Sequence, residues 1–304
     1  MKLDGVFLPV TTPFDRVSGE VDLEGFASNV KAWCHHPIAG LVVGGSTGEA
    51  VLLDEAELLR LVERGATARR DGTALIAGTG AESTRATIRQ CVGMAEAGAD
   101  AVLVRAPAYF RARMTAEALR THFLAVADAS PVPLILYHVP KFVPVDVVPE
   151  LAAELLRHGN IVGIKDSSGD LHNLGALCEA IGDAGAVVVG SGTVVYPGLE
   201  MGASGAIIAV GLLAPAAACE LYRSWAAGRS AEAGRQQERI GPLHKRVVAG
   251  IGVAGVKHGL DLLGFVGGLS RPPLLPPTDR ERLEVAEALE GAGLRDEASA
   301  STSG

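Results

Sequence analysis

Residues 161–166 read IVGIKD, a short apolar run that ends in a lysine and an aspartate. Seven similar runs occur elsewhere in the chain, at residues 5–10, 39–45, 74–80, 99–107, 132–139, 187–191 and 205–210. Each is short, nearly continuous in its hydrophobicity and bounded by glycine, proline or polar residues, which is typical of a strand buried on both faces. The sequence therefore predicts eight strands.

Amphipathic segments of helical length lie between these runs, for example at residues 22–34, 54–70, 83–97, 115–127 and 147–156. Strands that alternate with helices form parallel sheets, and eight such units predict a closed (β/α)8 TIM barrel. An open doubly wound sheet is the second choice. It is weakened because no G-x-G-x-x-G follows the first run; the lone GTG at residues 78–80 indicates only a tight turn.

The chain after Pro215 predicts helices alone, at residues 216–227, 231–248, 253–263 and 278–289. The first would close the barrel and the others would form a C-terminal helical extension. We therefore expect a barrel over residues 1–226, a helical lobe packed on it over 227–292, and a flexible tail over 293–304.

Composition limits the classes of function. The chain has 304 residues and a formal net charge of −8, which argues against a nucleic-acid partner. The start, MKLDGVFLPV, lacks the features of a signal peptide, and Pro215 interrupts the apolar stretch at residues 203–222, so no membrane span is expected. Four scattered cysteines indicate reduced thiols in a cytoplasmic protein.

Lys165 is the first candidate for chemistry, because the active site of such a barrel lies at the C-terminal ends of its strands. Burial favours the neutral form of an amine, which is the nucleophile that attacks a ketone. A salt bridge to Asp166 is an equally good interpretation from position alone. The other lysines, among them Lys257, lie in loops, helices or the terminus, where solvation is expected to be easy.

Two more strand ends carry groups that could bind a substrate or transfer protons beside Lys165. Gly44-Gly45-Ser46-Thr47-Gly48-Glu49 follows the second run and combines glycines with two hydroxyls, an arrangement suited to a carboxylate, although it could simply cap the next helix. Tyr137 lies near the end of the fifth run and could move protons beside Lys165, or could be a packing residue. Strand alternation should point His138 away from Tyr137, toward the helices.

In this order and spacing, these sites resemble the dihydrodipicolinate synthase and N-acetylneuraminate lyase superfamily of class I aldolases. The resemblance runs from about Gly5 to Pro276 and is carried by residues 45–49, Pro107-Ala108-Tyr109, Tyr137-His138-Val139-Pro140, Gly163-Ile164-Lys165-Asp166 and Gly190. It implies that Lys165 forms a Schiff base with pyruvate, and because the imine itself stabilises the carbanion, no cofactor is expected. No cluster of His, Asp and Glu has the spacing of metal ligands, so no metal is expected either.

The resemblance also implies roles for the remaining residues. Tyr137 would be the acid-base group, and Thr47 and Tyr109 would complete a proton relay, with Tyr109 reaching in from a neighbouring subunit of a homotetramer built as a dimer of dimers. Substrate would be bound by residues Ser46, Thr47, Gly48, Ser167, Gly190 and Ile207.

Departures from the superfamily pattern concern the aldehyde partner. Dihydrodipicolinate synthases carry an arginine where this chain has Phe142, and N-acetylneuraminate lyases carry acidic residues where it has Ser191, Gly192 and Thr193. Residues 108–119, 163–170, 190–206 and 252–268 are similar instead to 4-hydroxy-2-oxoglutarate aldolases, in which Ser167 is a candidate for binding the second carboxylate or the aldehyde. Cleavage to pyruvate and glyoxylate is therefore the favoured hypothesis. The alternatives are 4-hydroxy-tetrahydrodipicolinate synthase, a sugar-acid lyase or hydratase-aldolase, and a catalytically silent binding barrel.

Overall fold

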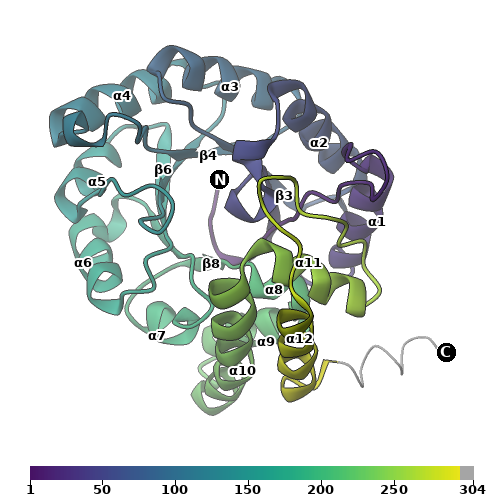
Figure 1. Cartoon of the computed structure of the whole chain (residues 1–304). Coiled ribbons are helices and arrows are strands. Elements are labelled where there is room, and N and C mark those ends of the chain that lie inside the picture. Colours follow the sequence, from purple (N-terminus) through teal and green to yellow (C-terminus); the bar gives the residue numbers. More distant parts are fainter. Residues whose placement is uncertain (295–304) are drawn as a thin grey trace.

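A computed structural model describes residues 1–294 of the chain. Its centre is a closed barrel of eight parallel strands in sequence order, as the sequence predicts (Figure 1). The strands are β1 (Gly5–Pro9), β2 (Gly40–Val43), β3 (Ala74–Thr79), β4 (Ala101–Arg105), β5 (Leu134–His138), β6 (Ile161–Asp166), β7 (Ala186–Val189) and β8 (Gly205–Ile207). The barrel closes where β1 pairs with β8, with Phe7 opposite Ile207.

Helices surround the strands as an outer ring (Figure 1). They are α1 (Leu23–Trp33), α2 (Glu55–Ala68), α3 (Thr84–Glu96), α4 (Ala116–Ala129), α5 (Pro149–Leu155), α6 (Leu171–Ile181), α7 (Val195–Glu200), α8 (Val210–Leu213) and α9 (Pro215–Ala226). Several begin where a side chain caps the first turn: Asp54 and Glu57 form a capping box on α2, and Ser83 and Thr115 accept backbone N–H groups of α3 and α4.

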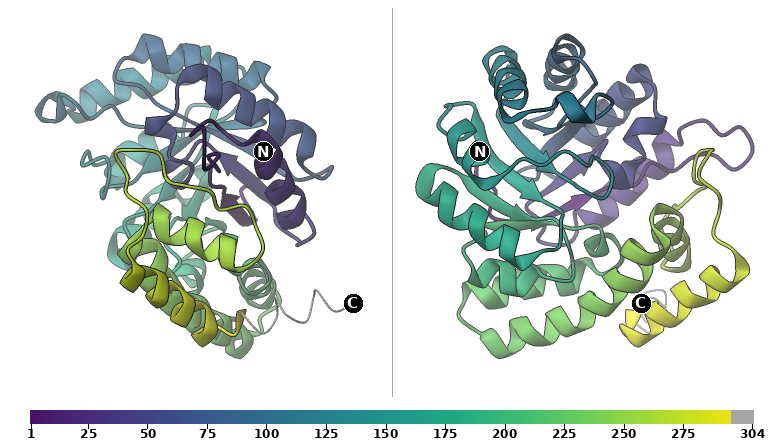
Figure 2. Two further views of the ribbon diagram at one scale, coloured as in Figure 1. Left: turned by 45° about the vertical axis from the view of Figure 1, so that its right-hand side comes forward. Right: turned by 60° about the vertical axis from the view of Figure 1, so that its left-hand side comes forward.

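The C-terminal helices pack beside the barrel (Figure 2). They are α10 (Ser230–Leu243), a π-helical segment over His244–Ile251, α11 (Val253–Leu262) and α12 (Asp279–Gly291). The single helix predicted over residues 231–248 is therefore an α-helix that changes to π-helical hydrogen bonding at His244. The division at residue 226 stays a prediction, and the predicted tail falls outside the described residues except for Gly293 and Leu294.

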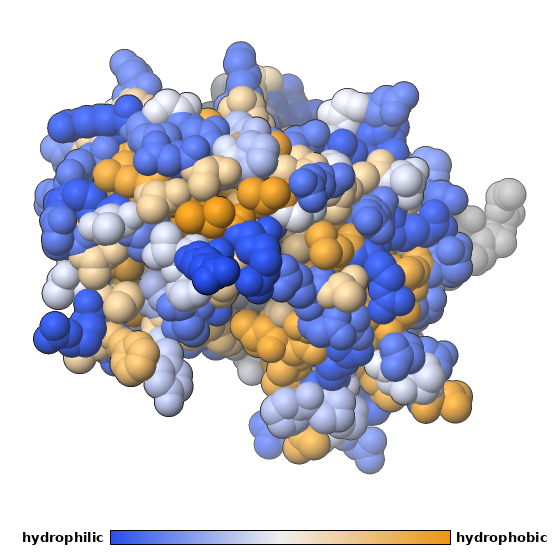
Figure 3. Space-filling model, turned by 90° about the horizontal axis from the view of Figure 1, so that it is seen from above, coloured by the Kyte–Doolittle hydropathy of each residue, from blue (hydrophilic) through white to orange (hydrophobic). Residues whose placement is uncertain are grey.

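The face seen from above mixes hydrophilic side chains with smaller groups of hydrophobic ones (Figure 3). No helix within residues 1–294 is long and apolar enough to cross a membrane. The apolar stretch at residues 203–222 forms β8, α8 and most of α9. The four cysteines carry free thiols, three of them buried.

Candidate active site

Tyr137 and Lys165 lie side by side at the C-terminal ends of β5 and β6. They are paired residues in the parallel register, so strand pleating points both side chains to the same side. The Lys165 Nζ lies 4.5 Å from the centre of the Tyr137 ring, and both side chains are buried, with 4% and 8% of their surface exposed. The register thus places a buried amine against a phenol.

The salt bridge between Lys165 and Asp166 is not formed. The Asp166 carboxylate faces the other way and accepts hydrogen bonds from His138 Nδ1 at 2.6 Å, Ser168 Oγ at 2.7 Å and Asn173 Nδ2 at 3.2 Å. No acid forms an ion pair with Lys165 within the described part of the chain. Its amine is therefore not held as the partner of a carboxylate there.

His138 lies on the opposite side of β5 from Tyr137, as strand alternation predicted. Burial opposes its protonation, but the nearby carboxylates of Asp166 and Asp146 outweigh this effect and raise the pKa of His138. The Asp146 Oδ1 lies 3.6 Å from His138 Nε2. The His138–Asp166 pair ties β5 to β6 behind the two candidate catalytic residues, which fits a structural role.

The turn after β2 brings hydroxyls to the same place. Ser46, Thr47 and Gly48 form a single 3-10 turn, and the Ser46 Oγ lies 3.3 Å from the Tyr137 hydroxyl. Backbone N–H groups at the start of such a turn have no acceptor within it, which leaves them available to an anion. The side chain of Thr47 has no hydrogen bond to Tyr137 within residues 1–294, so its role in a relay stays a prediction.

Ser167 and Gly190 are in close contact at the ends of β6 and β7. A Cβ atom at Gly190 would lie 2.1 Å from Ser167 Oγ and 2.7 Å from the Asp166 carbonyl oxygen, so this position requires glycine. The Ser167 hydroxyl is buried without a hydrogen-bond partner among the described residues. A buried polar group without a partner is costly, and a ligand would remove that cost. Ile207, at the end of β8, is fully buried.

Tyr109 is not brought into this site within one chain. It lies in the loop after β4 with 81% of its surface exposed, next to Phe110, which is 68% exposed. The loop is held by Glu82, whose carboxylate accepts the N–H groups of Ala108 and Tyr109, each at 2.8 Å, and pairs with Arg105. An entry from a neighbouring subunit stays a proposal.

Lys141 and Phe142 follow the fifth strand and face outward. Phe142 is 60% exposed, and the Lys141 amine donates to the Ala249 carbonyl oxygen of the π-helical segment at 3.0 Å. Lys141 is therefore engaged by the C-terminal helices. No arginine fork is present at this position.

The C-terminal helices reach the site at two points that sequence reasoning missed. His244 accepts a hydrogen bond from Gly192 N–H at 3.2 Å through Nδ1, which leaves its Nε2 to donate to Ser191 Oγ at 3.5 Å. Burial, with the charge of Lys141, lowers the pKa of His244 to about 4, so it is neutral near pH 7. The loop after β7 is thus fixed by a helix of the C-terminal lobe.

Lys257 is the second point, and the expectation that it is easily solvated was wrong. It is 1% exposed and forms an ion pair with Glu49, directly after the Ser46–Gly48 turn. A signal was present in the sequence, because Val253, Val256 and Leu260 mark an apolar helix face on which residue 257 also falls.

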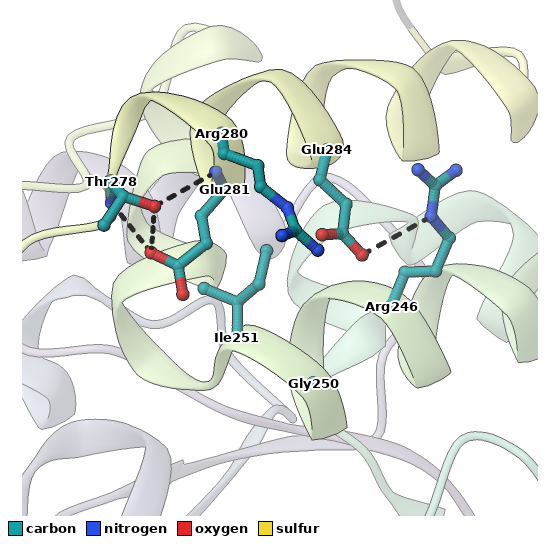
Figure 4. A pocket seen from close by; sticks show the side chains of 7 residues that line it. All are labelled: Arg246, Gly250, Ile251, Thr278, Arg280, Glu281 and Glu284. Atoms are coloured by element: carbon teal, nitrogen blue, oxygen red, sulfur yellow. Dashed lines mark hydrogen bonds and ion pairs between the residues drawn. The ribbon is translucent and has the colours of Figure 1, made fainter.

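A cavity of about 420 Å³ lies within the C-terminal lobe (Figure 4). None of its lining residues belongs to a barrel strand. Of these residues, Arg246 forms an ion pair with Glu284, and also one with Glu287 outside the lining at 2.9 Å. Glu281 is used by the capping box of α12. The cavity is separate from the site around Lys165.

No group of three or more His, Cys, Asp or Glu residues suited to a metal occurs in residues 1–294.

Comparison with known proteins identifies relatives. Residues 2–292 match the family described as "Dihydrodipicolinate synthetase family". A curated relative from Gluconacetobacter diazotrophicus, named 4-hydroxy-tetrahydrodipicolinate synthase, is 35% identical over 95% of this chain and 97% of its own.

Solved structures match as well. The chloride-inhibited dihydrodipicolinate synthase from Acinetobacter baumannii, complexed with pyruvate, has a TM-score of 0.91 and 31% identity, over 96% of this chain and 100% of its own. A monomeric dihydrodipicolinate synthase variant has a TM-score of 0.91 and 27% identity, over 96% and 97% of the two chains. Similarity to these proteins therefore leaves the number of subunits open.

Proposed function

Because the chain belongs to the dihydrodipicolinate synthetase family and is a class I pyruvate-dependent aldolase, we propose that Lys165 is the amine that forms the Schiff base. One observation carries this assignment: Lys165 is buried at a strand end, against Tyr137, with no carboxylate paired to it in the described residues. Reductive trapping with pyruvate and borohydride tests this step, because only a lysine that forms the imine is labelled.

The chemistry follows from these groups. The neutral amine attacks the keto carbon of pyruvate, and loss of water from the carbinolamine leaves a protonated imine. Loss of a C3 proton then gives an enamine, whose C3 attacks the carbonyl carbon of an aldehyde; hydrolysis of the new imine returns the amine. The Tyr137 hydroxyl, within reach of Ser46, is the proposed proton carrier.

The proposed pocket holds pyruvate between the turn and the strand ends. The hydroxyls and N–H groups of Ser46 and Thr47, with Gly48 behind them, would bind the carboxylate. Gly190 and Ile207 would form the walls around the methyl and keto groups. In this proposal, Thr47 and a partner subunit's copy of Tyr109 would extend the proton path from Tyr137.

The identity of the aldehyde that reacts with pyruvate is a separate question. Curated relatives between 31% and 35% identical to the chain are named 4-hydroxy-tetrahydrodipicolinate synthase. Removing pyruvate from that product leaves a four-carbon amino-acid semialdehyde with its own carboxylate. Condensation of pyruvate with this semialdehyde is our first candidate, in preference to the hydroxyoxoglutarate cleavage that the sequence favoured.

Cleavage of 4-hydroxy-2-oxoglutarate remains the second candidate, because of one specific observation. The position that carries a carboxylate-binding arginine in dihydrodipicolinate synthases is the exposed Phe142, and Lys141 beside it is bonded to Ala249. A bidentate fork for the semialdehyde carboxylate is therefore missing there. The unpartnered Ser167 hydroxyl is a donor that a smaller aldehyde acid could use.

Steady-state kinetics separate the two candidates. We expect pyruvate and the semialdehyde to give the higher kcat/KM, and Phe142→Arg to raise that value by roughly ten-fold by adding the fork. Phe142→Leu is the matched control and should leave it unchanged. Faster release of pyruvate and glyoxylate from 4-hydroxy-2-oxoglutarate, with no gain from Phe142→Arg, would establish the second candidate.

A further inference from the structure

Glu49 has a backbone conformation that no other non-glycine residue shares within residues 1–294. Its φ of 57° and ψ of 32° lie in the left-handed region, which is unfavourable for a residue with a long side chain. It directly follows Ser46, Thr47 and Gly48, the proposed carboxylate-binding residues. Such a conformation persists only where the surroundings enforce it.

The side chain of Glu49 is held by the C-terminal part of the chain. One carboxylate oxygen forms the ion pair with Lys257 of α11, and the other accepts the N–H of Arg271 at 2.8 Å. The Lys257 amine also donates to the Leu269 carbonyl oxygen at 2.6 Å and lies 4.4 Å from the centre of the Phe14 ring. The carboxylate is thus fixed from two directions.

This ion pair is fully buried, with 0% and 1% of the two side chains exposed. Desolvation of two such charges cancels much of their attraction, so a buried pair adds little stability over an apolar one. Burial lowers the pKa of Lys257, and the charge of Glu49 opposes that effect. A gain in stability therefore does not explain why Glu49 and Lys257 form a buried ion pair. Precise placement of the Ser46–Gly48 turn does explain it.

The barrel also fixes the turn, at Gly48, next to Glu49. The Gly48 carbonyl oxygen accepts the Thr12 hydroxyl at 2.7 Å, and a Cβ atom at Gly48 would lie 3.0 Å from the Val10 carbonyl oxygen. The end of the turn is therefore held through Gly48 by the segment that follows β1, and through Glu49 by Lys257. Ser46, at the start of the same turn, lies 3.3 Å from the Tyr137 hydroxyl.

We propose that the Glu49–Lys257 ion pair is a positioning device through which the C-terminal lobe sets the Ser46–Gly48 turn for binding the pyruvate carboxylate. This inference rests on the proposed function. It gives α11 an indirect role in pyruvate binding, through Glu49. Weaker pyruvate binding, with the reactivity of Lys165 retained, is the effect expected when the pair is removed.

The test uses the full-length protein and pyruvate itself. Borohydride trapping at increasing pyruvate concentrations gives a half-saturating concentration and a maximum labelled fraction by intact-mass spectrometry, and a melting curve reports stability. Lys257→Met leaves Glu49 buried and unpaired, so its melting temperature should fall. In the double variant Glu49→Gln, Lys257→Met no charge is left unpaired, and its melting temperature should return close to the wild-type value.

The two roles predict different behaviour for the double variant. If the pair positions the turn, the half-saturating pyruvate concentration stays raised by roughly ten-fold or more while the maximum labelled fraction is unchanged. If the pair were only structural, pyruvate binding would recover together with stability, and the proposal would be overturned. Arg16→Ala is the control, because it removes an ion pair of Asp261 on the same helix without touching Glu49.

A second variant covers the case in which the double variant does not fold. Lys257→Arg keeps the positive charge but replaces the compact ammonium by a planar group, so the same rise in half-saturation is expected. A wild-type value for Lys257→Arg would then count against the proposal. If pyruvate does not label the wild-type protein, the proposed function itself is overturned. If pyruvate labels all variants with the wild-type half-saturating concentration, only the positioning role of the ion pair is overturned.

Discussion

Tyr137 and Lys165 are paired across β5 and β6, with the lysine amine 4.5 Å from the centre of the tyrosine ring. This contact depends on the register of two neighbouring strands, because a shift by one residue would place one of the two side chains on the opposite side of the barrel wall. The same register places His138 beside Asp166 on the other side. The register of β5 and β6 thus places the proposed catalytic pair, Tyr137 and Lys165, on one face and the structural pair, His138 and Asp166, on the other.

Tyr137→Phe should keep the fold and slow the reaction. The ring that packs beside Lys165 remains, but the hydroxyl that reaches Ser46 is lost, so we expect kcat to fall by about 10²- to 10⁴-fold. Steady-state kinetics and a melting curve measure the two effects. Tyr222→Phe is the control, since its hydroxyl donates to the Ser204 carbonyl oxygen and is no part of the proposed site. An unchanged kcat in Tyr137→Phe would exclude the proton-carrier role.

Gly190→Ala should damage the site by steric conflict. The added Cβ would lie 2.1 Å from Ser167 Oγ and 2.7 Å from the Asp166 carbonyl oxygen, so the ends of β6 and β7 must move apart. Overpacking of this kind costs about 1–3 kcal/mol, measured by chemical denaturation, and activity should fall with it. Gly234→Ala is the matched control, because its Cβ meets nothing within 4 Å inside α10. Full activity in Gly190→Ala would contradict the described contact.

Two buried histidines should make the protein sensitive to acid. Burial lowers the pKa of both His122 and His244 from 6.5 to about 4. Between pH 4 and pH 6.5 the unfolded chain binds more protons than the folded one, so the free energy of unfolding rises with pH across this range. It therefore decreases as the pH falls from 6.5 to 4. The loss should be roughly 3 kcal/mol for each histidine by pH 4.

Urea denaturation at several pH values checks this expectation. His122→Asn keeps a polar group near Thr84 but removes the titration, so its stability should vary less between pH 6.5 and 4. His172→Gln is the exposed control and should follow the wild type. Identical pH curves for wild type and His122→Asn would show that His122 does not contribute.

Mixing two inactive variants tests whether Tyr109 acts in a neighbouring subunit. Tyr109→Phe retains Lys165, and Lys165→Ala retains Tyr109, so a mixed pair contains one complete site. With random exchange in a two-fold dimer, about a quarter of the sites are complete, and about that share of wild-type activity should return. No recovery after exchange has been demonstrated by native mass spectrometry would place Tyr109 outside the site.

Much of the fold could be predicted from local pattern. Each of the eight predicted strands overlaps a strand of the barrel, and only β7 begins outside its predicted run, by one residue, because runs buried on both faces are apolar and short. The pairing of Tyr137 with Lys165 is expected from their strand ends. Alternation along β6 points Lys165 and Asp166 to opposite faces, just as it separates Tyr137 from His138 in β5. Which neighbouring strand each side chain meets depends on the strand register and cannot be derived from one strand alone.

The contributions of the C-terminal helices were harder to predict. Lys257 and His244 meet Glu49 and Gly192 from positions more than 50 residues away in the chain, and nothing local signals such contacts. The change to π-helical hydrogen bonding at His244 also has no pattern of its own, although Pro242 lies just before it. Long-range packing, and not local propensity, determines these features.

Intact-mass spectrometry after incubation with pyruvate and borohydride tests the central claim most directly. Reduction of the imine should add the mass of pyruvic acid less one oxygen atom, once per chain, with peptide mapping to Lys165 and no label in Lys165→Ala. A wild-type protein that takes up no label, or a label that persists in Lys165→Ala, would contradict Lys165 as the Schiff-base lysine.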